Sequence, residues 1–103
     1  MFRTLMDENV KLLFDAILTL ETEEDCLAFF EDLCTVKELT EMSRRFRAAQ
    51  MLDANTIYTD IADQTGLSTA TISRVNRCLK YGSDGYTRVL ARLAEAKPKD
   101  GAQ

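Results

Sequence analysis

The sequence contains no histidine and no tryptophan, and its three cysteines, at positions 26, 34 and 78, lack CxxC spacing. Without histidine, a structural zinc site would need four thiolates or help from carboxylates, so we expect no metal site. An odd number of unclustered cysteines in apolar surroundings indicates reduced, buried thiols in a cytoplasmic protein. No stretch approaches the roughly 20 apolar residues of a membrane span. Asp7 and Glu8 also stand where a signal peptide would be apolar.

The same absences count against catalysis. A nucleophilic enzyme needs an activating base near its nucleophile, and histidine, the commonest base, is missing. The four glycines form no glycine-rich phosphate loop. We therefore expect no enzyme and no cofactor.

Charge is divided unevenly along the chain. The formal net charge is −4, but residues 1–34 carry nine acidic and two basic groups, whereas 35–103 carry eight acidic and eleven basic groups. The segment 66–92 has five basic groups and one acid. Such a concentration of positive charge favours contact with phosphate, and the acidic N-terminal part is expected to face away from nucleic acid.

The stretch 59–80 has the pattern of a helix-turn-helix. We expect its first helix to begin at Thr59, whose hydroxyl would cap free N–H groups, with the small Ala62 at the helix contact. Gly66 should end that helix with a positive φ. Leu67 is then expected to enter the core, and Ser68 to cap a second helix that ends at Lys80.

The second helix is predicted to have one buried and one open face. Ile72, Val75 and Leu79 recur at helical spacing and form the buried stripe. The opposite face is small near its N-terminus and basic further along, ending at Tyr81, which suits base edges and phosphates in turn. An ordinary helix pair with a solvated polar face is the alternative. The residues expected to contact DNA are Ser68, Thr69, Ala70, Thr71, Ser73, Arg74, Arg77 and Lys80.

The remaining pattern is helical throughout, so the chain is predicted to be all-α with about six helices. A first helix over about 3–20 is apolar on nearly every side, which indicates packing against a second copy of the chain. The alternative is a central core helix of a monomer. One domain is expected over 1–96, followed by a flexible tail over 97–103.

Three further helices complete the prediction. The second should run from a cap at Thr22 to about Cys34, and the third from a capping box at Thr35 to about Leu52. A last helix, capped by Ser83 or Asp84, should extend to about Leu93. In the third helix the expected inward stripe is Leu39, Met42, Phe46, Ala49 and Leu52. Its other faces carry Arg44, Arg45 and Arg47, which suit either solvent and ion pairs with Glu38 and Glu41, or contact with phosphate or a small anion.

Residues from about Leu12 to Leu93 resemble the Trp repressor superfamily, and in particular its YerC/YecD branch of Trp-repressor-like proteins. The likeness is carried by TGLSTATISRVNRCLKYG and by the preceding helix MSRRFRAAQML. It implies an all-helical, intertwined homodimer that binds operator DNA as a repressor-like transcription regulator. A helix-turn-helix used for protein–protein assembly is the alternative function.

The resemblance also implies an effector pocket. The arginines that clamp tryptophan in the family correspond to Arg45 and Arg74, and Thr35 and Thr71 match other pocket positions. The family glycine that leaves space for the indole is replaced by Val75, and a pocket serine by Cys78, a weaker hydrogen-bond partner. We therefore do not expect tryptophan as co-repressor; a smaller effector, or none, fits better.

Overall fold

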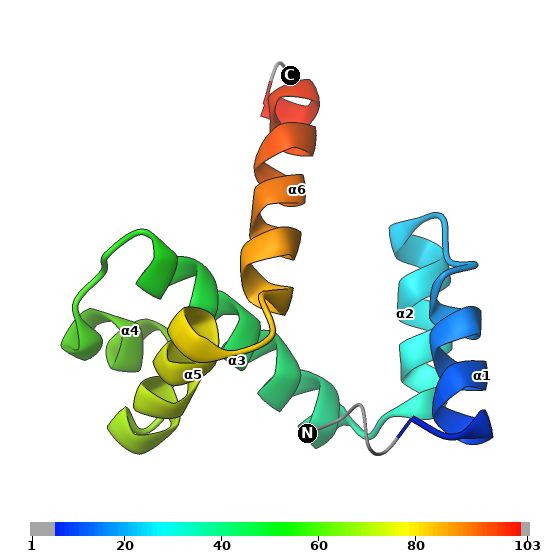
Figure 1. The fold of residues 1–103 in the computed structure, drawn as a ribbon, viewed down its shortest axis with the longest axis horizontal. Helices are drawn as coiled ribbons and strands as arrows, with labels where there is room; N and C mark the ends of the chain where they lie inside the picture. Colours follow the sequence, from blue (N-terminus) through cyan, green and yellow to red (C-terminus); the bar gives the residue numbers. More distant parts are fainter. Residues whose placement is uncertain (1–5, 102–103) are drawn as a thin grey trace. The chain divides into compact units, whose positions relative to one another are not determined.

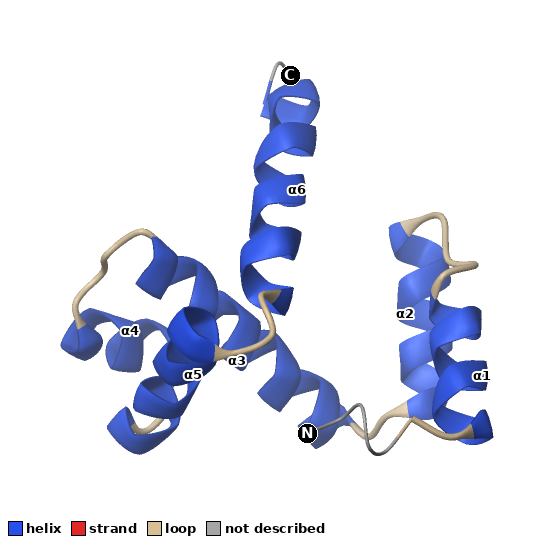
Figure 2. Cartoon of the chain, viewed as in Figure 1, coloured by secondary structure: helices blue, strands red, loops and turns tan. Residues whose placement is uncertain are grey.

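The chain folds into helices joined by short turns (Figures 1 and 2). The computed structural model describes residues 6–101, and within that range it contains six helices and no strand. The predicted all-α fold with about six helices is confirmed. The helices are α1 (Glu8–Ile17), α2 (Glu23–Leu33), α3 (Val36–Asp53), α4 (Tyr58–Thr65), α5 (Thr69–Tyr81) and α6 (Gly85–Gly101).

The helices fall into two compact units. One comprises Met1–Lys37, with α1 and α2, and the other comprises Glu38–Gln103, with most of α3 and all of α4, α5 and α6. The expectation of one domain over 1–96 with a tail over 97–103 stays a prediction.

Side-chain caps fix where α1 and α2 begin. Asp7 accepts a hydrogen bond from the Val10 N–H at 2.9 Å, and Thr22 accepts one from the Asp25 N–H at 3.0 Å. Each cap satisfies one of the N–H groups that a helix leaves without a partner in its first turn. The predicted cap at Thr22 is therefore confirmed.

The first helix is shorter than expected. It begins at Glu8, and the start predicted near Arg3 lies outside the described residues. At its other end the predicted limit of 20 is wrong, because α1 stops at Ile17. The chain tightens there into a turn, in which both the N–H and the hydroxyl of Thr19 donate to the Ala16 carbonyl, at 3.1 and 2.7 Å.

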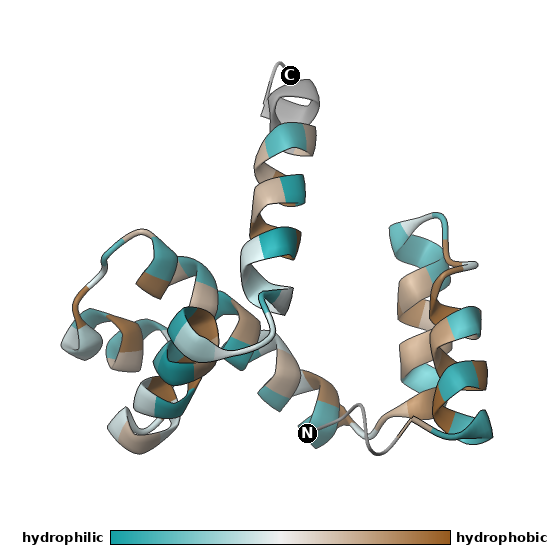
Figure 3. Cartoon of the chain, in the orientation of Figure 1, coloured by the Kyte–Doolittle hydropathy of each residue, from teal (hydrophilic) through white to brown (hydrophobic). Residues whose placement is uncertain are grey.

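Many apolar side chains of the first unit are exposed to solvent in the single chain. No residue of α1 or α2 is buried, and Leu12 and Leu18 are 68% and 82% exposed. Hydrophobic residues are frequent along both helices (Figure 3). The described part of the chain therefore provides no full cover for the helix that the sequence predicted to be buried on several sides.

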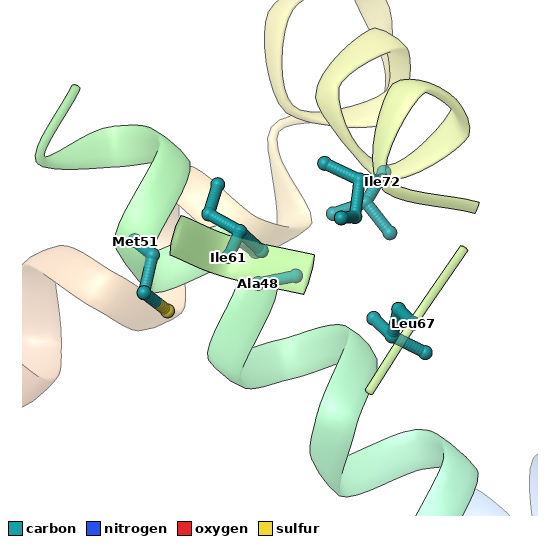
Figure 4. Packing of buried hydrophobic residues seen from close by; sticks show 7 residues of the cluster. Ala48, Met51, Ile61, Leu67 and Ile72 are labelled. Atoms are coloured by element: carbon teal, nitrogen blue, oxygen red, sulfur yellow. The ribbon is translucent and has the colours of Figure 1, made fainter. Parts of the chain in front are cut away.

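The second unit contains the hydrophobic core. Its buried cluster joins α3, α4, the turn after α4, and α5 (Figure 4), and comprises Ala48, Ala49, Met51, Ile61, Leu67, Ile72 and Val75. Ala48, Ala49, Ile61 and Ile72 are 0% exposed. The two alanines bring no long side chain into the contact, so neighbouring helices can approach α3 closely.

The inward face of α3 is rotated from the predicted one. Leu39 and Met42 are exposed, while Ala48 and Met51, which the predicted stripe omitted, are buried. Of the predicted stripe, Ala49 is fully buried, and Phe46 and Leu52 are half-buried. Ala62, the small residue expected at the contact between the paired helices, is half-buried against the same cluster.

Two other helix ends differ from the prediction. The helix α4 begins at Tyr58, and the preceding Ile57 provides no side-chain cap, so the predicted cap at Thr59 is wrong. The helix α6 continues to Gly101 rather than ending near Leu93. It starts after Asp84, which has a left-handed φ of 66° and whose carbonyl accepts the Arg88 N–H at 2.9 Å.

Candidate nucleic-acid interface

A tight turn joins α4 to α5. Gly66 has a φ of 76°, a left-handed backbone conformation that residues with a Cβ seldom adopt. Its N–H donates to the Ala62 carbonyl at 2.8 Å, which closes the last turn of α4. Leu67 follows in the core at 7% exposure. The predicted roles of Gly66 and Leu67 are both confirmed.

Thr65 stabilises this turn, a role that was not predicted from the sequence. Its side chain is 6% exposed; the hydroxyl donates to the Ile61 carbonyl at 2.7 Å and accepts the Leu67 N–H at 3.2 Å. A single hydroxyl thus connects the last turn of α4 to the residue after Gly66. The sequence does contain a pattern from which this role could have been predicted: a threonine, which is β-branched and carries a hydroxyl, directly before the glycine that ends the helix.

Ser68 caps α5, as predicted. Its oxygen accepts the Thr71 N–H at 3.1 Å, and its hydroxyl donates to the Thr71 Oγ1, also at 3.1 Å. Both residues belong to the predicted DNA-contact set, so two of its hydroxyls already fix the start of the helix. Any contact with a phosphate would use their remaining hydrogen-bonding capacity.

The two faces of α5 have opposite environments. Ile72 and Val75 are buried at 0% and 2% exposure, as predicted, whereas Leu79, the third residue of the predicted buried stripe, is only half-buried. On the other side the predicted contact residues Thr69, Ala70, Ser73, Arg74, Arg77 and Lys80 are all exposed. We call these six residues the open face of α5.

The three basic side chains of the open face are free of ion pairs within the described residues. Within residues 6–96, no ion pair engages Arg74, Arg77 or Lys80. An ion pair within this range joins Lys11 to Asp15 on α1, at 3.0 Å. Unpaired guanidinium and ammonium groups on an exposed helix face retain their donors for an incoming anion.

The arginine cluster of α3 separates into three environments. Arg47 donates to Gln50 Oε1 at 2.8 Å along its own helix, Arg45 is half-buried, and Arg44 is exposed. Arg44 reaches the turn, because a Cβ placed on Gly66 would lie 3.9 Å from its Nη1. The sequence pattern placed Arg44 only within the arginine cluster, and the structure places its charge directly beside the helix-turn-helix.

Comparison with known proteins assigns this architecture to a family. The family model described as "Trp repressor protein" matches residues 8–94. The chain belongs to the Trp repressor family. It is 41% identical over 99 residues to the uncharacterized protein YerC of Bacillus subtilis, a match that covers 96% of this chain and 95% of YerC.

Two solved structures share the fold. A TrpR-like protein from Eubacterium eligens superposes with a TM-score of 0.86 at 51% identity, covering 89% of this chain and 95% of that one. A candidate Trp repressor from Staphylococcus aureus superposes with a TM-score of 0.86 at 46% identity, covering 90% of this chain and 93% of the other. The expected resemblance to the Trp repressor superfamily and its YerC branch is confirmed, and the fold is that of TrpR-like proteins.

The residues that the Trp repressor resemblance assigned to an effector pocket lie in both units. Thr35 belongs to the first unit, while Arg45, Arg74, Val75 and Cys78 belong to the second. Val75 is 2% exposed within the hydrophobic cluster, whereas Arg74 and Cys78 are exposed. Of these residues, Val75 thus belongs to the hydrophobic core.

The cysteines differ from expectation. Cys26 and Cys78 are exposed and Cys34 is half-buried, so the prediction of buried thiols is wrong, although all three are free.

Among the described residues, no group of three or more cysteine, aspartate and glutamate side chains is arranged to hold a metal ion. No described helix is both long enough and apolar enough to cross a membrane.

Proposed function

We propose that this member of the Trp repressor family is a sequence-specific, repressor-like transcription regulator of the cytoplasm. It binds double-stranded DNA as a homodimer and places α5 in the major groove. The open face of α5, whose three basic side chains have no ion pair within residues 6–96, carries the proposal. Because Ile72 and Val75 are anchored in the core on the opposite side, that face is held outward by the packing of the whole second unit.

The open face supplies two kinds of contact. Near its start, Thr69, Ala70 and Ser73 are small, so the helix backbone can approach base edges closely. Further along, Arg74 and Arg77 can bind guanine edges or phosphates, and Lys80 can bind phosphate. Ser68 and Thr71 stand at the helix start, where free N–H groups and the helix dipole attract a phosphate.

The proposed homodimer rests on the apolar surface that the single chain leaves uncovered. Leu12, Leu18 and Leu27 are more than half exposed in the first unit, and Val89 and Leu93 of α6 are 43% and 47% exposed. Covering such side chains with a second copy removes apolar area from water, which is the main driving force of association. A dimer also provides the two α5 helices that a two-fold symmetric operator requires.

We further propose that DNA binding does not depend on tryptophan. Val75 is packed among core side chains, and its carbon atoms occupy the position where the family glycine leaves space for an indole. The same packing joins α5 to α3 and α4 through buried side chains of this chain alone, which supports the proposal. Any effector that binds beside Val75 would therefore have to be smaller than tryptophan.

Protein–protein assembly through the helix-turn-helix is the second candidate, with the acidic N-terminal unit as the docking surface. The unpaired positive charge on the open face favours DNA over this use. A catalytic role has less support, because the open face presents hydroxyls and cations without a base to activate them.

Selection of bound sequences from random duplex DNA, followed by affinity measurements at two salt concentrations, tests the proposal. We expect two half-sites about one helical turn, roughly 34–36 Å, apart. If one arginine contacts a base, Arg74→Ala or Arg77→Ala should cost about 1–3 kcal/mol of binding and relax preference at one position in each half-site. If it contacts only phosphate, the affinity for all DNA sequences should fall alike. The salt slope, which is the slope of log K against the logarithm of the salt concentration, should then decrease in magnitude by about one.

Lys11→Ala provides a control that removes one positive charge already paired with Asp15. It should leave DNA affinity nearly unchanged. If Arg74→Ala and Arg77→Ala also leave affinity unchanged, the open face of α5 is not the DNA-binding surface. If the unaltered protein shows little salt-dependent binding to any duplex, protein–protein assembly becomes the better explanation.

A further inference from the structure

The last residue of α5 is an exposed aromatic side chain that the proposed contacts do not use. Tyr81 is 84% exposed. Within the part of the chain that the structure describes, its hydroxyl has no hydrogen-bond partner and its ring contacts no other aromatic ring. Packing within the chain therefore does not explain a tyrosine at this position.

The direction of Tyr81 from the helix axis matches that of the open face. At about 100° per residue, Ala70, Arg74, Arg77 and Tyr81 fall within about 60° of one another around α5. Ile72 and Val75, which are buried, lie on the opposite side. Tyr81 thus extends the line of the two arginines to the end of the helix.

The distance along α5 from Ala70 to Tyr81 determines which part of the DNA Tyr81 can contact. From Ala70 to Tyr81 the helix rises about 16 Å, at 1.5 Å per residue, whereas the major groove is about 12 Å wide. The N-terminal residues of a recognition helix meet the base edges. When Ala70 is close to the bases, the C-terminal end of α5 therefore lies at the border of the groove, where the phosphates are.

Gly82 keeps the approach to Tyr81 open. Its N–H donates to the Cys78 carbonyl at 2.9 Å, and a Cβ on Gly82 would collide with that same carbonyl oxygen. Glycine therefore allows the chain to leave the helix directly after Tyr81. It also brings no side chain of its own beside the phenol ring.

From this placement we propose that Tyr81 is a further DNA-contact residue, whose phenol O–H donates a hydrogen bond to a backbone phosphate at the edge of the major groove. Tyrosine is one of the neutral side chains that donate to phosphate oxygens and thereby fix a protein's register on the duplex. The inference rests on the proposed DNA-binding function and extends the contact surface beyond Lys80. Because the phenol is uncharged, it adds affinity without releasing a counterion.

The test measures binding of the full chain to a selected duplex and to an unrelated duplex, by fluorescence anisotropy over a range of salt. Tyr81→Phe removes only the hydroxyl and should weaken binding to both duplexes by about three- to ten-fold, the usual effect of one hydrogen bond. Its salt slope should equal that of the unaltered protein. Lys80→Ala, by comparison, should lower the slope by about one.

Tyr86→Phe is the matched control, because it removes the same hydroxyl from a half-buried ring whose centroid lies 6.2 Å from that of Phe46. It should leave the Kd unchanged. Circular dichroism melting of each variant shows whether it remains folded, and sedimentation of Tyr81→Ala shows whether the ring joins two copies of the chain.

Each remaining outcome overturns a stated part of the inference. If the unaltered protein binds DNA but Tyr81→Phe binds equally well, the role of Tyr81 is refuted and the proposed function stands. Loss of preference for the selected duplex would make Tyr81 a base contact, and loss of the dimer in Tyr81→Ala would make it a subunit contact. If the unaltered protein binds no duplex, both proposals fail together.

Discussion

Replacing Thr65 by valine tests how the turn between α4 and α5 is held. Valine keeps the β-branched shape and removes one donor and one acceptor, so the hydrogen bonds to the Ile61 carbonyl and from the Leu67 N–H are both lost. The second loss matters more, because Leu67 is 7% exposed and little water can reach its N–H. An N–H group left buried without a partner costs about 1–3 kcal/mol, against about 0.5–1.5 kcal/mol for an ordinary hydrogen bond.

The expected net effect is about 2 kcal/mol of lost stability, after a small gain from the additional buried methyl group. For a domain of this size that corresponds to a fall of roughly 8–16 °C in Tm. Urea unfolding followed by circular dichroism, at one fixed protein concentration, should show a lower midpoint with an unchanged slope.

Thr59→Val makes the same substitution at an exposed position of α4 and serves as the control. It should change stability by no more than about 0.5 kcal/mol. If Thr65→Val is as stable as the unaltered protein, the Thr65 hydroxyl does not hold the turn, and the reasoning from these two hydrogen bonds is wrong.

Three further outcomes are expected. Sedimentation equilibrium at low micromolar concentration should give about twice the chain mass of 11.7 kDa, and a folded monomer there would contradict the proposed homodimer. Titration calorimetry should show no saturable heat with millimolar tryptophan, whereas micromolar affinity would mean that Val75 does not fill the pocket. Gly66→Ala should lower the free energy of unfolding by about 1–2 kcal/mol through its left-handed backbone alone, because the nearest atom to the added Cβ, Arg44 Nη1, is 3.9 Å away; an unchanged urea midpoint would show that the turn relaxes without cost.

Features that depend on neighbouring residues could be predicted from the sequence. The cap at Ser68, the turn at Gly66 and the buried pair Ile72 and Val75 each follow from residues within one or two helical turns. The same holds for the cap at Thr22. At these positions the local chemistry allows few backbone alternatives, so short patterns were sufficient.

Features that depend on distant partners were predicted less well. The α3 sequence has apolar residues on two overlapping faces, and periodicity alone does not say which face meets α4 and α5. The structure buries Ala48 and Met51 and leaves Leu39 and Met42 exposed. The exposure of Cys26 and Cys78 was misjudged for the same reason, since an apolar neighbourhood in the sequence need not be an interior in space.

For the candidate site, the sequence predicted the helix and its outward face, and the structure adds how the residues are engaged. It shows that Ser68 and Thr71 bond to each other and that Thr65 fastens the turn. It also shows that Arg44 reaches the turn from another helix. Proximity between α3 and the turn is a tertiary property, which no spacing within 59–80 could reveal.

The short range of the bonds around Gly66 has a consequence for the order of folding. Thr65 bonds to Ile61 and Leu67, and Ser68 bonds to Thr71, so no partner is more than four positions away in the chain. Closing such short loops costs little conformational entropy, so contacts of this kind can form early in folding. We expect the α4–α5 corner to be largely built in the transition state, so that substitutions there slow folding more than they accelerate unfolding.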